Sequence, residues 1–143
     1  MQHPPSIKRF DIFYLASLGV YAAGFFLGFD EQVAQVREQY AAAGVAINPG
    51  GILTGSFVFG MLIGLALWWF VSNRGSNVAR WIIAAFLALG LLNLVYGIAS
   101  GVFGGLTLSL GFTIAATVLS AVAVYYLFQP DANAWFDRER SER

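Results

Sequence analysis

Charged residues are absent from four long stretches of this chain. No Asp, Glu, Lys, Arg or His occurs within residues 12–29, 51–72, 81–100 or 106–128. A helix crosses a hydrocarbon core about 30 Å thick with roughly 20 residues, and each stretch is long enough to do so. The pattern predicts four membrane-spanning helices, at about residues 10–29, 50–72, 79–100 and 106–128.

The composition points the same way. Hydrophobic residues make up 58% of the 143 residues and charged residues only 11%, against roughly 25% charged in an ordinary soluble domain. A soluble domain of this size could not bury so much apolar surface. We therefore expect one all-α domain over residues 1–143, a four-helix bundle with up-down-up-down connections.

The net charge and the scarcity of cysteine and histidine argue against several kinds of function. A net charge of zero argues against a nucleic-acid binder, which normally presents a basic face. The absence of cysteine excludes thiolate metal sites and thiol redox chemistry. The single histidine, His3, precedes every predicted span, so two histidines cannot ligate a haem within one chain. We expect no cofactor, no metal site and no catalytic residue.

The first span also has features of a signal peptide. Lys8 and Arg9 precede the apolar run, and Val20-Tyr21-Ala22 resembles a cleavage site. The apolar run continues past this point to Phe29. We therefore expect the segment to be retained as a span.

Basic residues predict the orientation, because Lys and Arg near span ends tend to stay in the cytoplasm. Up-down-up-down connections place seven of them on one side: Lys8, Arg9, Arg74, Arg80, Arg138, Arg140 and Arg143. Only Arg37 falls on the other side. Both termini, including the tail 129–143, are predicted to be cytoplasmic, in a bacterial inner membrane.

Amphipathic aromatic residues gather near the same side. Indole and phenol rings favour the headgroup level, where the ring is in apolar surroundings and the N–H or O–H meets water. The predicted interface anchors are Trp68, Trp69, Trp81, Tyr125, Tyr126 and Trp135.

Helix start and stop residues mark the connections. Asn48 and Pro49 suit the N-cap and first position of the second span, Gly75 suits its end, and Ser76 or Asn77 suits the next N-cap. Spans two and three should form a tight antiparallel hairpin.

Further breaks flank the fourth span. Gly101, Gly104 and Gly105 predict a turn before it. Pro130 ends it, with Asp131 as the expected cap of a short terminal helix.

Residues 30–47 form the one substantial outer segment. Val33, Val36 and Tyr40 recur at helical spacing, opposite acidic positions, and Gly44 is a suitable stop. The segment is predicted to be an amphipathic helix on the outer membrane surface or capping the bundle. A docking surface for a partner is the alternative.

Small residues recur every four positions in the spans. In lipid, close backbone approach supplies much of the energy of helix association, so such GxxxG-like rows predict packing faces. A glycine-lined path or a dimer interface is the alternative. The predicted packing residues are Gly24, Gly28, Ser56, Gly60, Gly64, Gly97, Gly101 and Gly111.

Asn93 is the only amide side chain well inside a predicted span. An unpaired amide in lipid is costly, so we expect Asn93 to hydrogen-bond across helices, with Thr113 and Thr117 as partners. A polar ligand site formed by these three residues with Tyr96 is the alternative. Asp11 lies at a span boundary beside Lys8 and Arg9, which predicts an ion pair there.

The chain ends in a distinctive string. Residues 125–131, YYLFQPD, are followed by Trp135 and Phe136. This ending resembles that of small uncharacterised four-span bacterial inner-membrane proteins, and the layout of most of the chain is similar to theirs. The resemblance implies an inner-membrane location and carries over no activity.

Two functions remain in view. Abundant packing motifs and scarce polar residues favour a non-enzymatic structural or accessory subunit that packs against lipid and other membrane helices, or against copies of itself. The alternative is a small carrier or channel for an uncharged or lipid-like solute that uses the Asn93 region. A membrane enzyme is disfavoured, because the spans lack residues for proton transfer.

Overall fold

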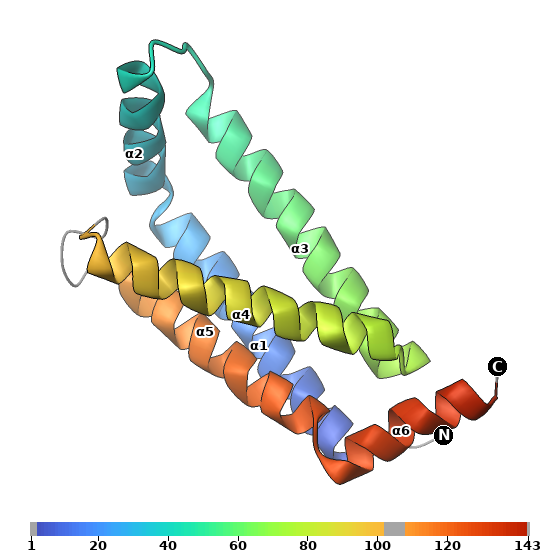
Figure 1. The fold of residues 1–143 in the computed structure, drawn as a ribbon. Helices are drawn as coiled ribbons and strands as arrows, with labels where there is room; N and C mark the ends of the chain where they lie inside the picture. The colour runs from blue at the N-terminus through green and yellow to red at the C-terminus, as the bar shows by residue number, and fades with distance from the viewer. Residues whose placement is uncertain (1–2, 102–107, 143) are drawn as a thin grey trace.

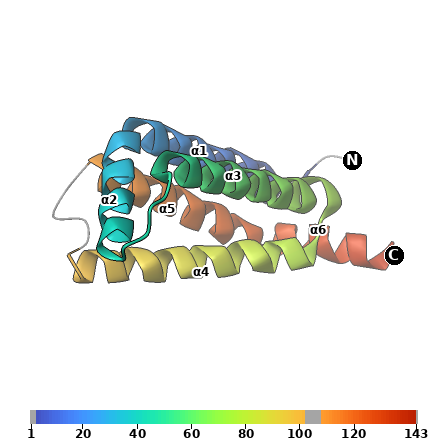
Figure 2. The ribbon, with the colours of Figure 1, turned by 90° about the horizontal axis from the view of Figure 1, so that it is seen from above.

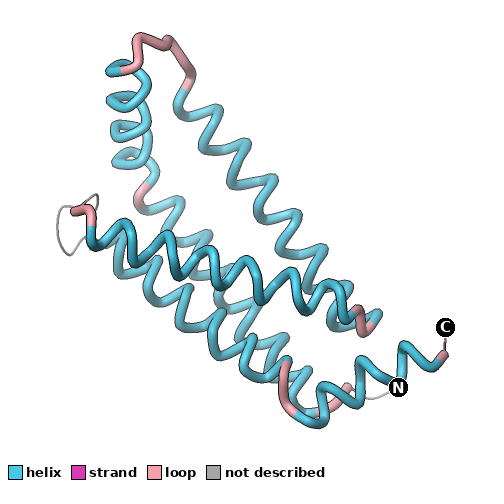
Figure 3. Tube along the Cα trace, viewed as in Figure 1, coloured by secondary structure: helices cyan, strands magenta, loops and turns pink. Residues whose placement is uncertain are grey.

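The computed structural model describes residues 3–101 and 108–142, and this part of the chain is helical with no strand (Figures 1 and 3). Its six helices are α1 (Pro5–Leu27), α2 (Phe29–Ala42), α3 (Pro49–Arg74), α4 (Asn77–Ala99), α5 (Leu108–Leu127) and α6 (Pro130–Ser141). Four of them, α1, α3, α4 and α5, are long and apolar enough to cross a membrane. For the described residues, the predictions of an all-helical fold and of four such helices are confirmed.

The predicted helix ends between α3 and α4 are confirmed at residue level. Asn48 is the N-cap of α3, and its side-chain oxygen accepts a hydrogen bond from the Gly51 amide. Gly75 ends α3 in the left-handed conformation, which glycine adopts without steric cost. Ser76 then caps α4 by accepting from the Ala79 amide. These contacts are local in sequence, which is why they could be predicted.

The outer segment folds into the predicted short helix, which ends close to the predicted stop at Gly44. The helix α2 ends at Ala42, and Gly44 follows with a positive φ of 74°. The Val45 amide donates to the Tyr40 carbonyl and closes this end. None of the residues of α2 is buried, so the helix lies beside α1 and α3 rather than within the bundle (Figure 2). Its role as a membrane-surface helix or a docking surface stays a prediction.

The most extensive helix pairing joins α1 and α5. The other two apolar helices are less closely associated with this pair. The short connection at residues 75–76 joins α3 to α4, but from there the two helices diverge (Figure 1). The hairpin expected from sequence is therefore tight only at its connection.

The buried core lies at one end of the molecule. It contains Ile7 and Phe10 of α1, Val71 of α3, Leu127 of α5 and, from α6, Trp135 and Phe136. The start of α1, the α3–α4 connection and α6 all meet at this end (Figure 1). The Lys and Arg residues predicted to be cytoplasmic, as far as the structure describes them, belong to the helix ends that meet here. We therefore call this end of the molecule the basic end.

Asp131 links α6 to the start of α1. Its carboxylate accepts hydrogen bonds from the Ser6 hydroxyl at 2.7 Å and the Ser6 amide at 3.0 Å. The prediction that Asp131 caps its own helix is wrong, because Gln129 is the N-cap of α6 and makes no side-chain cap. A carboxylate suits the first turn of α1, where backbone N–H groups lack helical partners. The Ser6 hydroxyl first, and then the Ser6 amide, lower the pKa of Asp131.

This contact predicts a pH dependence. A carboxylate whose pKa is lowered by folding stabilises the protein above the pKa of an unfolded Asp, about 3.9, and the stabilisation is lost as the pH falls through the lowered value. We expect Asp131→Asn to narrow the difference in thermal unfolding midpoint between pH 7 and strongly acidic solution. The measurement is a set of melts in mild detergent. Parallel pH profiles for wild type and variant would contradict the assignment.

The helices α1 and α5 approach each other closely at Gly24. A Cβ on Gly24 would lie 2.7 Å from Phe112 Cβ, which is too short for a normal contact. A Cβ on Gly19, in the same helix, would meet nothing within 4 Å. The glycine at position 24 is therefore what lets these two helices pack.

Gly24→Ala should lower the free energy of unfolding by about 1–3 kcal/mol, the usual cost of overpacking. Gly19→Ala is the matched control and should cause no loss. Denaturation in a mixed-detergent titration measures both. Equal stabilities for the two variants would show that the α1–α5 contact tolerates a methyl group at position 24.

Candidate functional site

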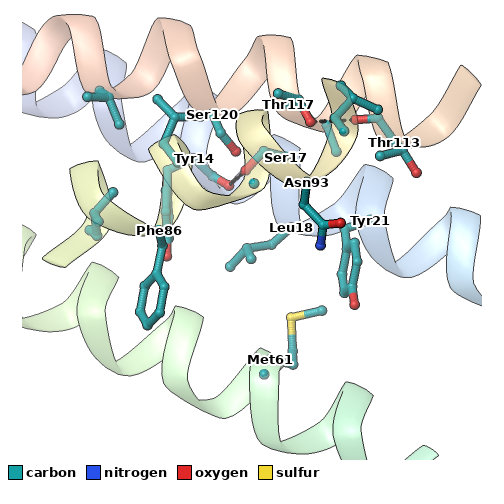
Figure 4. A pocket seen from close by; sticks show the side chains of 17 residues that line it. Tyr14, Ser17, Leu18, Tyr21, Met61, Phe86, Asn93, Thr113, Thr117 and Ser120 are labelled. Carbon is teal, nitrogen blue, oxygen red and sulfur yellow. Dashed lines mark hydrogen bonds between the residues drawn. The ribbon is translucent and has the colours of Figure 1, made fainter. Parts of the chain in front are cut away.

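A cavity of about 490 Å³ lies among α1, α3, α4 and α5 (Figure 4). Pockets that hold small molecules typically measure about 300–1,000 Å³. The cavity is only partly enclosed, and several residues that line it, including Gly60 of α3 and Gly90 of α4, are exposed. It is wide enough for a ligand and open at the surface of the apolar helices.

The lining is mostly apolar with a limited set of polar groups. Its polar members are Tyr14, Ser17 and Tyr21 of α1, Asn93 of α4, and Thr113, Thr117 and Ser120 of α5. The part of the lining supplied by α3, Gly60 and Met61, carries no hydroxyl or amide. None of the described residues that line the cavity is charged. This mixture fits an uncharged ligand with both apolar and polar parts.

Several of the polar groups are already engaged by the protein. The Tyr14 hydroxyl donates to the Gly64 carbonyl at 2.9 Å, which connects α1 to α3. The Ser17 hydroxyl donates to the Tyr14 carbonyl at 2.6 Å, and the Thr117 hydroxyl donates to the Thr113 carbonyl at 2.8 Å. The hydroxyls of Ser17 and Thr117 thus satisfy groups of their own helices.

The side-chain amide of Asn93 differs from these hydroxyl groups. Within residues 3–101 and 108–142, its amide makes no hydrogen bond, although it lines the cavity with Thr113 and Thr117. The hydrogen bond expected between Asn93 and these threonines is therefore not formed in the described part of the chain. Asn93 is exposed, and its side chain points into the cavity (Figure 4). Its unused donors and acceptor are available to a ligand.

The structure brings together three of the four residues of the predicted polar site. Tyr96 is the exception, because it is 71% exposed and does not line the cavity. Four polar residues of the lining were missed: Tyr14, Ser17, Tyr21 and Ser120. The sequence did contain a signal for the three of them that belong to α1. Tyr14, Ser17 and Tyr21 are spaced by three and four positions, which places them on one face of α1.

A second polar cluster sits at the basic end between α1 and α3. Asp11 accepts from Trp68 Nε1 at 2.9 Å and from Ser72 Oγ at 3.0 Å, and His3 Nε2 lies 2.7 Å from the Ser72 carbonyl oxygen. The expected ion pair of Asp11 with Lys8 or Arg9 is not formed in the described part of the chain. Asp11 instead accepts hydrogen bonds from Trp68 and Ser72, and these bonds hold α3 against α1.

Some of the predicted packing residues lie close to a neighbouring helix, and others have open space beside them. Gly64 is buried, and a Cβ there would lie 3.2 Å from Leu18 of α1, so α1 and α3 approach closely at this point. A Cβ on Gly60 or Gly111 would meet nothing within 4 Å.

The other packing residues are less uniform. Gly28 and Gly97 are buried, Ser56 is exposed, and Gly101, with φ 71°, follows α4. Gly104 and Gly105 lie outside the described residues. The small residues of each row therefore do not share one environment.

The predicted interface anchors also differ in their surroundings. Trp69, Trp81 and Tyr125 are exposed at the basic end. Trp68 donates to Asp11, and Tyr126 stacks on Phe13. Trp135 is buried against the core. The position of all six residues in the membrane interface stays a prediction.

Comparison with known proteins gives no relative. No protein-family model matches the chain, and no curated protein or solved structure matches it. The resemblance of residues 125–136 to small four-span inner-membrane proteins therefore stays a prediction. Any functional conclusion has to come from the site itself.

The Asp11 cluster predicts a stability effect. Asp11→Leu leaves the donors of Trp68 and Ser72 without their acceptor, and we expect it to lower the free energy of unfolding by about 1–3 kcal/mol. Asp11→Asn should lose less, since one amide oxygen remains. Thermal unfolding in mild detergent is the measurement, with exposed Asp30→Leu on α2 as the control. If Asp11→Leu and Asp30→Leu behaved alike, the cluster would have no role in holding α3.

Proposed function

We propose that this chain is a multi-pass membrane protein whose cavity binds an uncharged or lipid-like molecule, which it carries or conducts. The observation that supports this most strongly is the chemistry of the cavity. Its described lining is uncharged, largely apolar, and includes an Asn93 amide without a hydrogen-bond partner in the described part of the chain. A side chain that the fold leaves unpaired in apolar surroundings is costly unless a ligand or solvent engages it.

We further propose a bacterial inner membrane as the location, with both termini in the cytoplasm. The distribution of charge supports this orientation. The basic end includes Lys8, Arg9, Arg74 and Arg80, whereas Arg37 belongs to α2 at the far end. Positive charge close to span ends favours the cytoplasmic side. Arg143 lies outside the described residues.

A structural or accessory subunit is the second candidate. It is favoured by the exposed small residues of α3. Ser56 and Gly60 are exposed, and Gly60 has open space where a side chain would be. Such a surface allows another helix to approach closely, as small residues do in membrane helix pairs. The partner would be another membrane protein or a second copy of this chain.

Filling the cavity tests the leading proposal. Gly60→Leu and Gly90→Leu each place a side chain in open space at the lining, so both should fold and bind less ligand. Gly55→Leu is the control, because Gly55 also has open space but lies outside the lining. We expect purification in mild detergent to yield a bound neutral molecule with wild type and Gly55→Leu, detected by mass spectrometry. Its amount should fall several-fold in the two cavity variants.

The two functions give different outcomes in this experiment. If Gly60→Leu released a co-purifying protein while Gly90→Leu did not, and no small molecule were bound, the accessory function would be supported. Vesicles containing wild-type protein should also pass the identified molecule faster than empty vesicles. Equal bound ligand in all four proteins would argue against a binding role for the cavity.

A further inference from the structure

The polar groups of the cavity that remain available define one kind of ligand. Among the described residues, the side chains of Asn93 and Ser120 make no hydrogen bond, and the Tyr21 hydroxyl makes none either. The ring of Tyr21 is held by stacking on Phe57 of α3, with centroids 5.8 Å apart. Asn93 and Tyr21 both point into the cavity from different helices (Figure 4). Together they offer N–H and O–H donors to an oxygen acceptor.

The electrostatics of the cavity oppose a charged headgroup. A phosphate or ammonium group in apolar surroundings needs a compensating charge, and the described lining supplies none. The described basic residues are placed at the helix ends or on α2 instead, away from this part of the spans. A hydroxyl, ester or ketone group needs only the hydrogen bonds that Asn93 and Tyr21 can make.

The position of the opening points to the bilayer as the source. The helices α3 and α4 diverge from their connection at the basic end (Figure 1). Along α4, the cavity residues Phe86, Gly90 and Asn93 are exposed, and Phe86 is 52% exposed. In a chain that spans a membrane these surfaces face lipid, so a lipid can reach the cavity sideways without crossing the aqueous phase.

We propose that the cavity takes a neutral lipid, with its hydroxyl or carbonyl oxygen hydrogen-bonded to Asn93 and Tyr21 and its hydrocarbon part against the apolar wall of α3. This inference rests on the proposed binding function and adds the class of ligand. Met61 and Gly60 supply the apolar wall. The polar contacts select the head, and the absence of charge in the described lining rejects anionic and cationic lipids.

Photo-labelling of the full chain in phosphatidylcholine nanodiscs tests the inference. Three probes share one diazirine-bearing hydrocarbon chain and end in a hydroxyl group, a phosphate group or a plain methyl group. We expect the alcohol probe to label residues of the cavity strongly and the phosphate probe to label them at background. Asn93→Leu should weaken labelling by the alcohol about tenfold, the upper worth of one net hydrogen bond, and leave the methyl probe unchanged.

Two variants complete the design. Tyr21→Phe removes only the hydroxyl and keeps the ring, so a smaller loss with the alcohol probe is expected even if Asn93→Leu were to fold poorly. Asn73→Leu is the matched control, because Asn73 is exposed at the end of α3 and outside the lining. Equal labelling by alcohol and phosphate, or labelling by the alcohol that neither Asn93→Leu nor Tyr21→Phe changes, overturns the neutral-head inference but leaves a binding function. Absence of cavity labelling by all three probes overturns the binding function as well.

Discussion

The close pairing of α1 with α5 is the contact on which the rest of this structure depends. Apolar side chains gain little by leaving lipid for protein, so helices in a membrane associate through close packing and through polar contacts. Gly24 provides the close approach, since no other residue type fits against Phe112 without a shift. The pair α1 and α5 then presents most of the polar wall of the cavity, and α3 and α4 complete it from the other side.

The attachment of α3 shows the second way in which membrane helices are held. Its basic end is bonded to α1 through Asp11, Trp68 and Ser72, and its middle through Tyr14 and Gly64. Further along, Phe57 stacks on Phe25 with centroids 4.1 Å apart. These contacts keep α3 beside α1, whereas α3 and α4 share only the connection and its surroundings. The cavity exists because α3 follows α1 rather than α4.

Features set by neighbouring residues were predictable from the sequence, and features set by distant residues were not. The four apolar helices depend on continuous runs of neighbouring residues, and the cap at Asn48 and the stop at Gly75 each depend on a few adjacent positions. The partners of Asp11 are separated from it by 57 and 61 positions, and Ser6 is separated from Asp131 by 125. Asn93 was recognised because it is an amide in an apolar span, but Ser120 was missed because an isolated serine is common in such helices. The divergence of α3 and α4 depends on tertiary packing that no local pattern encodes.

The connection between α3 and α4 has a consequence for the cavity. Gly75 ends α3 and Ser76 caps α4, so no residue lies between the two caps. The rotational phase of α4 is thereby fixed relative to the end of α3. One residue inserted in the first turn of α4 would turn the remainder of that helix by about 100° and carry Gly90 and Asn93 round to another face. The direction in which the cavity residues of α4 face is thus set at a two-residue junction far from the cavity.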